Sequence, residues 1–206
     1  MDEGVAFMSF EQMVRVPVER VGAVVGKEGA TKKSLESELG VQLDIDGKEG
    51  LIVVKSQGLE GTDPFAALRI IEAIGRGFSP QRARRLLDEG TVLEVIDLRA
   101  YAGRSPNSLE RIRGRVIGVK GKSRRVIEEL TRCQVSIYGR TVAIIGEAPE
   151  VQLASDAVKM LATGSQHKTV YNSLQKARSK RKTERMFLWE GTSPETLSER
   201  LAKTKG

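Results

Sequence analysis

Residues 22–29 read G-A-V-V-G-K-E-G and residues 114–121 read G-R-V-I-G-V-K-G, so the chain contains the same glycine-rich stretch twice. The offset of 92 residues holds for two dozen positions downstream, where apolar residues coincide and Glu36 falls on Glu128. A single G-x-x-G arises easily by chance among 21 glycines, whereas a repeat that keeps its apolar flanks does not. The repeat predicts two copies of one fold, each with a loop that exposes its backbone.

The apolar periodicity gives each copy the order β-α-α-β-β-α. The first copy is expected to contain a strand with alternating Val14, Val16 and Val18, helices at 19–25 and 30–39, strands at 41–45 and 51–55, and a helix from Asp63-Pro64 to about Gly75. The second copy is expected to contain a strand at 91–98, an insertion at 99–110 with the helix-start signal Ser105-Pro106 and hence a longer helix before the loop, and a final helix at about 149–163.

The elements predict an α+β protein with two similar domains and two further helical segments. We expect a first domain at 8–77, a capped linker helix at 78–90, a second domain at 91–164 and a basic, helical C-terminal extension at 165–206. Within the extension the helix is expected through Lys182, with a short frayed helix at 193–205. Each domain is large enough to bury a core of its own.

The net charge of +7 is unevenly distributed. Residues 1–96 have a net charge of −4, residues 97–132 of +6, residues 133–163 of −1 and residues 164–206 of +6. Positive charge is therefore concentrated around the second glycine loop and in the extension. This distribution predicts a polyanionic partner there, although a solvated basic face without a partner is the alternative.

Composition argues against several classes of function. No apolar run approaches the ~18–20 residues of a membrane span, and the start Met-Asp-Glu lacks the basic region of a signal peptide. We expect a soluble cytoplasmic protein without membrane contact. One cysteine and one histidine are too few for a disulfide framework, a structural zinc site or a catalytic triad. We expect no enzyme activity, no cofactor and no small-molecule substrate.

Those two residues have separate interpretations. Cys133 takes the place of Val41 in a core strand, which predicts a small buried apolar residue. His167 follows the last helix of the second copy, where it fits either a contact with RNA or an ordinary surface position.

A G-x-x-G loop between two helices suits close contact with a phosphate backbone. Glycines admit positive φ and remove the Cβ atoms that would hold a ligand away. The following helix directs unpaired N–H groups and a partial positive charge at the loop. Just before the loops, Val24-Val25 and Val116-Ile117 can anchor the helix and provide an apolar wall for bases. A tight helix–helix turn without a ligand is the alternative, and the duplication disfavours it.

The pattern V/I-V/I-G-x-x-G within β-α-α-β-β-α resembles the KH domain of type I, whose loop clamps about four nucleotides of single-stranded backbone. Further segments resemble the archaeal Krr/Dim-type family, the counterpart of the eukaryotic Partner of Nob: 74–80 (I-G-R-G-F-S-P), 141–146 (T-V-A-I-I-G) and 164–171 (G-S-Q-H-K-T-V-Y). The resemblance implies two KH domains that act in small-subunit ribosome assembly and bind single-stranded rRNA near its 3′ end, mainly through the second domain.

The predicted site residues follow from this resemblance and from the charge pattern. The predicted RNA-binding residues are Arg113, Arg115, Ile117, Gly118, Val119, Lys120, Gly121, Lys122, Arg124 and Arg125. A secondary RNA or partner site is predicted at Val25, Gly26, Lys27, Glu28 and Gly29. Arg124 and Arg125 also fit a solvated helix face, and for Lys32 and Lys33 that interpretation is preferred.

Two alternatives belong to other classes. In the first, the chain is a protein–protein adaptor, or an mRNA-binding regulator, and contact with rRNA is incidental. Its acidic first domain would then hold partners such as ribosome assembly or translation factors. In the second, the loops belong to a phosphate-handling enzyme, but the chain lacks the Lys-Ser/Thr of a P-loop and the spacing of a Rossmann fingerprint. An aromatic content of 4% also disfavours folds that stack bases on aromatic platforms.

Overall fold

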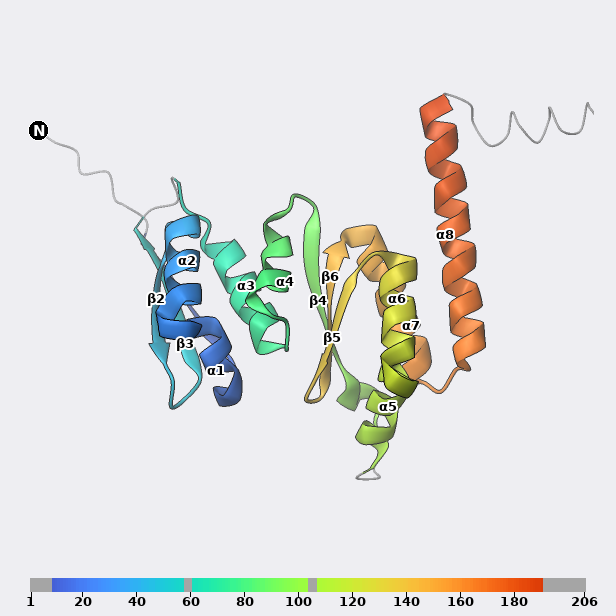
Figure 1. Ribbon diagram of the computed structural model, residues 1–206, viewed down its shortest axis with the longest axis horizontal. Coiled ribbons are helices and arrows are strands. Elements are labelled where there is room, and N and C mark those ends of the chain that lie inside the picture. Colours follow the sequence, from blue (N-terminus) through green and yellow to red (C-terminus); the bar gives the residue numbers. More distant parts are fainter. Residues whose placement is uncertain (1–8, 58–60, 104–106, 191–206) are drawn as a thin grey trace, which may run out of the picture.

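The computed structural model describes residues 9–57, 61–103 and 107–190, without the side chains of 9, 185 and 187–190. Figure 1 shows two α+β units that follow one another along the chain, and a long helix at the C-terminal end of the described part. Each unit contains a three-stranded antiparallel sheet. The predicted fold class, two tandem type I units with helices packed on a sheet and a helical extension, is confirmed.

The first unit has the predicted order of elements. They are β1 (Ser9–Arg15), α1 (Val18–Val25), a 3-10 turn (Lys27–Gly29), α2 (Ala30–Leu39), β2 (Gln42–Asp46), β3 (Leu51–Gln57) and α3 (Pro64–Gly75), and the strand order in the sheet is β1-β3-β2. Asp63 caps α3 as predicted, because its Oδ1 accepts from the Ala66 N–H at 2.8 Å. Gly40 ends α2 with φ 63°.

The alternation of valines misplaced the end of the first strand. The strand ends at Arg15, and Val18 is the first residue of α1 with 56% of its surface exposed. Val16 is buried at the junction, where its N–H donates to the Gly50 carbonyl at 2.8 Å. Pro17 has no N–H to continue a strand and instead precedes the helix, which explains the change of structure at this point.

The segment between the units is shorter and less regular than the predicted linker helix. It contains one turn of helix, α4 (Pro80–Ala83), followed by a 3-10 turn (Arg84–Leu87). Ser79 caps the turn through its Oγ, which accepts from the Arg82 N–H at 3.3 Å. Phe78, Ala83 and Leu86 are buried. The segment is therefore part of the core, and its packing determines its path.

The second unit repeats the order of the first. It consists of β4 (Thr91–Asp97), a 3-10 turn (Leu98–Tyr101), α5 (Ser108–Ile117), a 3-10 turn (Val119–Gly121), α6 (Lys122–Thr131), β5 (Gln134–Tyr138), β6 (Thr141–Glu147) and α7 (Ala148–Ala162), with strand order β4-β6-β5. The helix before the second loop has 10 residues against 8 in the first copy, as predicted. It begins at Ser108, and the expected start at Ser105-Pro106 lies outside the described residues.

The sheet of the second unit is covered on both faces. Val142 and Ile144 belong to the core with α5, α6 and α7, whereas Ala143 and Ile145 belong to the core of the first unit. All four are fully buried. Figure 1 shows this sheet between α3 and α4 on one side and α6 and α7 on the other. Burial on both faces explains the uninterrupted apolar run at 142–145. The core of the first unit extends onto this sheet and so joins the two units.

The sheet of the first unit has one covered face. Ile52 and Val54 point to the helices and are fully buried, whereas Met13 on the opposite face is 65% exposed. Within the described chain no element packs on that opposite face, as Figure 1 shows for β2 and β3.

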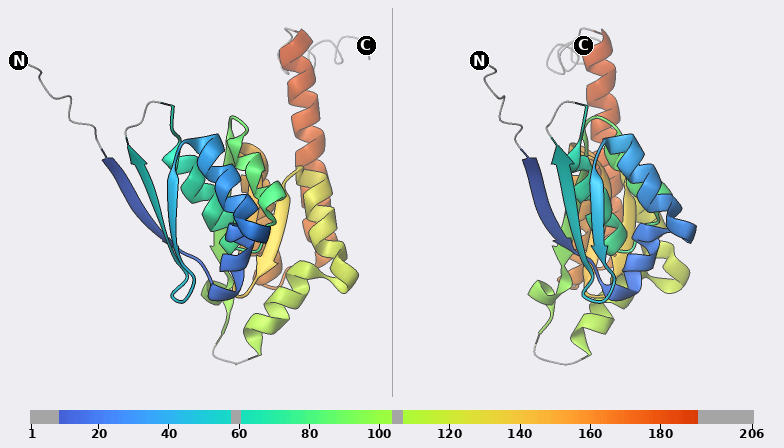
Figure 2. Two further views of the ribbon diagram at one scale, coloured as in Figure 1. Left: turned by 60° about the vertical axis from the view of Figure 1, so that its left-hand side comes forward. Right: turned by 90° about the vertical axis from the view of Figure 1, so that its left-hand side faces the viewer.

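A single long helix, α8 (His167–Glu190), forms the described part of the C-terminal extension. Val170 and Leu174 are buried in the core of the second unit, so the first half of α8 is packed against α6 and α7. Both views in Figure 2 show the second half of α8 extending beyond the two units. The short helix expected at 193–205 lies outside the described residues.

Candidate nucleic-acid interface

The two glycine loops have the same backbone conformation. Gly26 has φ 76° and ψ 176°, and Gly118 has φ 72° and ψ 172°. The third loop residue is left-handed in both, with φ 52° at Glu28 and at Lys120. The loops therefore differ in their side chains and not in the path of their backbone.

The first glycine of each loop is required by close packing as well as by its positive φ. A Cβ atom at Gly26 would lie 2.3 Å from Thr31 Oγ1, and one at Gly118 would lie 2.7 Å from the backbone nitrogen of Ser123. At Gly121, the last glycine of the second loop, no atom lies within 4 Å of that position. A ligand can therefore approach the backbone closely at Gly121.

Both helices that follow the loops begin without a side-chain cap. The first N–H groups of a helix have no acceptor within the helix and carry a partial positive charge. An anion at the loop would accept hydrogen bonds from these groups, and the phosphate of a nucleic acid has the necessary charge and size.

A glutamate on the second helix of each unit holds the neighbouring strand. Glu36 Oε1 accepts from the Leu43 N–H at 2.8 Å, and Glu128 Oε1 accepts from the Val135 N–H at 2.8 Å. The Val135 N–H therefore points away from β6, which is the one strand that pairs with β5 among the described residues. Because backbone groups alternate sides along an antiparallel strand, Ile137 presents its N–H and C=O along the same open edge.

The second loop presents one apolar side chain and several cations to solvent. Val119 is 82% exposed, and Lys120, Lys122 and Arg125 are exposed as well. Arg125 Nη2 donates to the Lys120 carbonyl at 3.2 Å, which keeps this guanidinium beside the loop. Ile117, at the end of α5, is half-buried and adds an apolar surface next to these charges.

Arg115 is engaged inside the fold. Its Nε donates to the Leu161 carbonyl at 3.2 Å and its Nη2 to the Ser165 carbonyl at 2.6 Å. Arg20 makes the corresponding pair of bonds at the end of α3, at 3.0 and 2.7 Å. Each arginine satisfies carbonyls that the end of a helix leaves without an internal partner. We therefore omit Arg115 from the proposed interface, although its sequence position predicted a contact with RNA.

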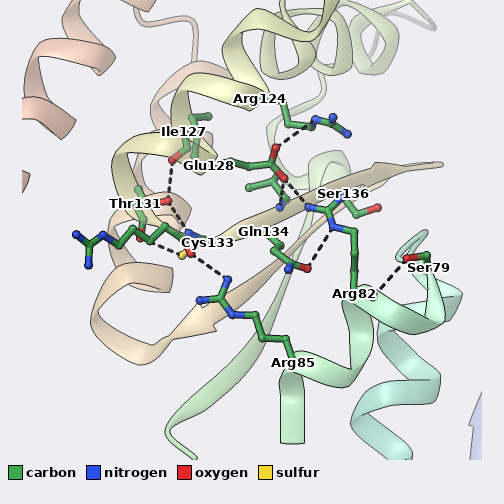
Figure 3. Close-up of polar contacts among 12 residues, drawn as sticks. Ser79, Arg82, Arg85, Arg124, Ile127, Glu128, Thr131, Cys133, Gln134 and Ser136 are labelled. Carbon is green, nitrogen blue, oxygen red and sulfur yellow. Dashed lines mark hydrogen bonds and ion pairs between the residues drawn. The ribbon is translucent and has the colours of Figure 1, made fainter. Parts of the chain in front are cut away.

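Arg124 shares an internal carboxylate with a residue from the linker. Arg124 Nε lies 3.7 Å from Glu128 Oε2, and its side chain remains 40% exposed. Arg82 Nη2 donates to Glu128 Oε1 at 2.7 Å, and Arg82 Nε donates to Gln134 Oε1 at 3.2 Å, as Figure 3 shows. Arg113 on α5 is half-buried. Because its side chain is 40% exposed, Arg124 keeps part of its charge at the surface beside the loop.

The linker contributes residues that the sequence pattern did not single out. Besides Arg82, Arg85 reaches the second unit, where its Nη1 donates to the Arg132 carbonyl at 3.1 Å (Figure 3). Tyr138 at the end of β5 donates to Glu19 of α1. The run R-A-R-R at 82–85 was the available signal, but its pattern does not distinguish an interdomain contact from a solvated face.

The first loop has no net charge, because Lys27 is balanced by Glu28, whereas the second loop carries one positive charge at Lys120. Lys27 and Glu28 are exposed, and Val25 is half-buried as Ile117 is. Lys32 Nζ lies 3.9 Å from Glu36 Oε1, so one of the two lysines after this loop faces a carboxylate. The structure thus brings residues 25–29 together in the geometry of the second loop, with an acid where the second loop has Lys120.

His167 and Cys133 both have internal partners. His167 Nε2 lies 2.9 Å from the Arg115 carbonyl, and its ring packs against Tyr171 with centroids 6.0 Å apart. It therefore ties the start of α8 to the end of α5. Cys133 is 3% exposed, and burial raises the pKa of its thiol to about 11. The interpretation of Cys133 as a buried core residue is confirmed.

The part of the chain that the structure describes lacks a cluster of metal ligands and a membrane-spanning helix. No group of three or more His, Cys, Asp and Glu side chains is placed there to hold a metal ion. No helix there is long and apolar enough to cross a membrane.

Comparisons with known proteins match both units. Residues 11–73 match the KH domain, and residues 92–179 match the type I KH domain that is the second one of PNO1. A KH domain-containing protein of Methanocaldococcus jannaschii is 46% identical over 185 residues, which are 88% of this chain and 80% of that protein. The pre-rRNA-processing protein PNO1 of Candida glabrata is 25% identical over 173 residues, which are 82% of this chain and 66% of that protein.

A solved structure has the same fold over most of the chain. The crystal structure of the a/eIF2alpha-aDim2p-rRNA complex from Pyrococcus horikoshii OT3 contains a chain that is 40% identical, with a TM-score of 0.79. The match covers 87% of this chain and 99% of that chain. On these sequence and structural matches, the chain belongs to the Dim2/PNO1 family of proteins with two KH domains.

Proposed function

We propose that this protein is a single-stranded RNA-binding assembly factor of the small ribosomal subunit. It binds rRNA near the 3′ end, mainly through its second KH domain, and works without catalysis. Two relatives support this role: PNO1 is by name a pre-rRNA-processing protein, and Dim2p of Pyrococcus horikoshii was crystallised with rRNA.

One feature carries the assignment to the second domain. The second loop combines an open backbone at Gly121 and an uncapped helix with exposed cations at Lys120, Lys122 and Arg125. The first loop has the same backbone but places Glu28 where the second has Lys120. Since the shapes agree, the difference in charge selects the second loop for a polyanion.

We expect the RNA strand to lie between the second loop (residues 118–121), α6 and the open edge of β5, a surface that we call the groove, and the groups there have different roles. Loop and helix N–H groups hold phosphates, and the exposed cations add affinity by releasing counterions. Ile117 and Val119 provide an apolar surface against which bases can lie. The open backbone groups of Ile137 can pair with the edge of a base. Because this pairing requires bases that are splayed from their partners, the groove selects a single strand over a duplex.

We assign the first domain to a protein partner or to a weaker contact with RNA. Its exposed Glu28 and the net negative charge of residues 1–96 disfavour a strong RNA site. The Pyrococcus complex also contains a/eIF2alpha, which favours a translation factor as the class of partner. An adaptor whose contact with rRNA is incidental remains the second candidate function.

Binding to three RNAs tests this proposal. A single strand from the 3′ end of small-subunit rRNA should bind more tightly than a scrambled strand of equal length, and a duplex of the rRNA sequence should bind least. Filter binding at fixed salt measures all three, because affinities for nucleic acids depend steeply on salt. Equal affinity for the three would reduce the protein to a general polyanion binder and would favour the adaptor.

A further inference from the structure

A second basic surface lies at the C-terminal end of α6, which is the end far from the glycine loop. A cleft of about 270 Å³ is formed there by the end of α6, the start of α7 and the middle of α8. Among the described residues that line it, the cations are Arg132, Arg178, Arg181 and Lys182, and the only acid is Glu150.

The cleft has an excess of positive charge. Arg181 Nη1 donates to Glu150 Oε1 at 3.0 Å and its Nη2 to the Pro149 carbonyl at 2.7 Å, so the one acid is already paired with a cation. Arg132, Arg178 and Lys182 are exposed and form no ion pair within the described part of the chain. Three positive charges therefore converge on the cleft without a counter-charge there.

Arg132 holds its place in a conformation that favours glycine. It has φ 60° and ψ 13°, and the equivalent residue of the first copy is Gly40, with φ 63° and ψ 28°. A side chain other than glycine costs roughly 1–2 kcal/mol in this conformation. Backbone strain of this kind persists only where the surrounding structure holds it, and it clusters at functional sites. The second copy therefore has an arginine at a position where the first copy has a glycine in the same backbone conformation.

The rest of the cleft is held rigidly. Val170 and Leu174 anchor α8 in the core, and the bonds from Arg181 to the start of α7 fix the helix about two turns further along. Arg178 and Lys182 are four residues apart, so they share one face of α8. Figure 1 shows the first part of α8 alongside α6 and α7.

We propose that this cleft binds phosphates of the RNA strand that continues beyond the groove of the second KH domain. This inference rests on the proposed function. The 10 residues of α6 separate the loop from Arg132 by about 15 Å, at a helical rise of about 1.5 Å per residue. A strand that fills the groove with about four nucleotides needs only a short extension to reach the cleft. Half-buried Leu130 and Leu153 provide an apolar floor for a sugar or a base.

A charge-matched pair of variants tests the cleft. Arg178→Gln with Lys182→Gln removes two charges from the cleft face of α8. The control, Lys176→Gln with Lys180→Gln, removes two exposed lysines about half a helical turn away on the same helix. All four side chains are exposed, so both variants should melt like the wild type, which circular dichroism checks. The RNAs are a strand of about four nucleotides that fills the groove, and the same strand extended to about three times that length on its 5′ or its 3′ side.

The cleft predicts a specific pattern in filter binding. With the short RNA, both variants should bind like the wild type. With one of the two extended RNAs, the cleft variant should flatten the slope of log K against log salt by about 1.4, at about 0.7 per lost contact with a single strand. That slope corresponds to roughly 25-fold weaker binding at about 0.1 M salt. The control variant should leave the slope unchanged.

Other outcomes would overturn the inference. Equal losses in the cleft and control variants, or equal losses for both extensions, would mean diffuse attraction by the whole helix. No loss in the cleft variant would exclude a contact at the cleft. Failure of the proposed function is distinguishable, because the wild type would then bind neither the short nor the extended RNA, and the two proposals would fall together.

Discussion

Replacement of Val119 and Lys120 by aspartate should abolish most RNA binding and leave the fold intact. Val119 is 82% exposed, so Val119→Asp removes little apolar contact. Lys120 has φ 52°, and the first loop already holds an acid, Glu28, at φ 52°. Aspartate also tolerates the left-handed region better than lysine does. We expect the free energy of unfolding to change by less than about 0.5 kcal/mol, as for most surface substitutions.

The loss in affinity follows from the charges. One pair of unit charges about 6 Å apart contributes roughly 0.7 kcal/mol at the dielectric of water and about 2.8 kcal/mol at an effective dielectric of 20. Val119→Asp with Lys120→Asp changes the loop by three charge units, from one attraction to two repulsions. Even at the dielectric of water the loss is about 2 kcal/mol, which is about 30-fold in affinity.

The first loop supplies the matched control. Lys27→Asp next to the native Glu28 produces two adjacent acids in a loop of the same backbone. Filter binding with the rRNA strand should show less than about a threefold loss for this variant, because a site of mainly structural or protein-binding character contributes little to RNA affinity. Unchanged binding by the second-loop variant, with an unchanged melting curve, would refute the site. Equal losses in the two variants would refute the asymmetry and place RNA on both domains.

Three further predictions concern the fold beneath the interface. Gly118→Ala should lower the free energy of unfolding by at least about 3 kcal/mol, because its Cβ would lie 2.6 Å from that of Ser123. Gly121→Ala should lower it by only about 1–2 kcal/mol, because the space there is open. Urea unfolding measures both. Arg115→Met should cost about 1–3 kcal/mol in the same assay and leave the RNA affinity of the folded protein unchanged. Burial raises the pKa of the Cys133 thiol from 9.0 to about 11, so the thiol should resist alkylation at about pH 8 until urea is added. The free energy of unfolding should fall as the pH rises from about 9 to about 11, because the thiol ionises in the unfolded chain before it does in the folded one.

The elements of both domains were predictable because their signals are local. Apolar periodicity and helix-stopping glycines placed α2 and the end of α3 at the predicted residues. The cap at Asp63 was readable from one dipeptide. The glycine loops were predictable for a different reason: a repeat of unusual backbone requirements is rarely accidental, and the structure shows contacts at Gly26 and Gly118 that admit no side chain.

The docking of the domains was not predictable in the same way. Its one signal was the continuous apolar run at 142–145, which indicates a strand buried on both faces but does not name what covers the second face. The carbonyl contacts of Arg115 could not be predicted by aligning the two copies. Arg20 makes the equivalent contacts from a position 95 residues earlier, not 92, so aligned residues of the two copies do not share this role. Without that knowledge, a cation beside the loop is naturally assigned to RNA.

A comparison of the two copies distinguishes the effect of backbone shape on RNA binding from the effect of side-chain charge. Their loops agree within a few degrees at every described backbone angle, and both are followed by an uncapped helix and a glutamate that holds the edge strand. These shared features create room for a phosphate backbone in either domain. The copies differ in the side chains around the loops, with Lys27 against Val119, Glu28 against Lys120 and Gly40 against Arg132. These three positions have no net charge in the first copy and a net charge of +2 in the second. Backbone shape therefore limits the ligand to a close-fitting strand, and the distribution of charge decides which domain binds it.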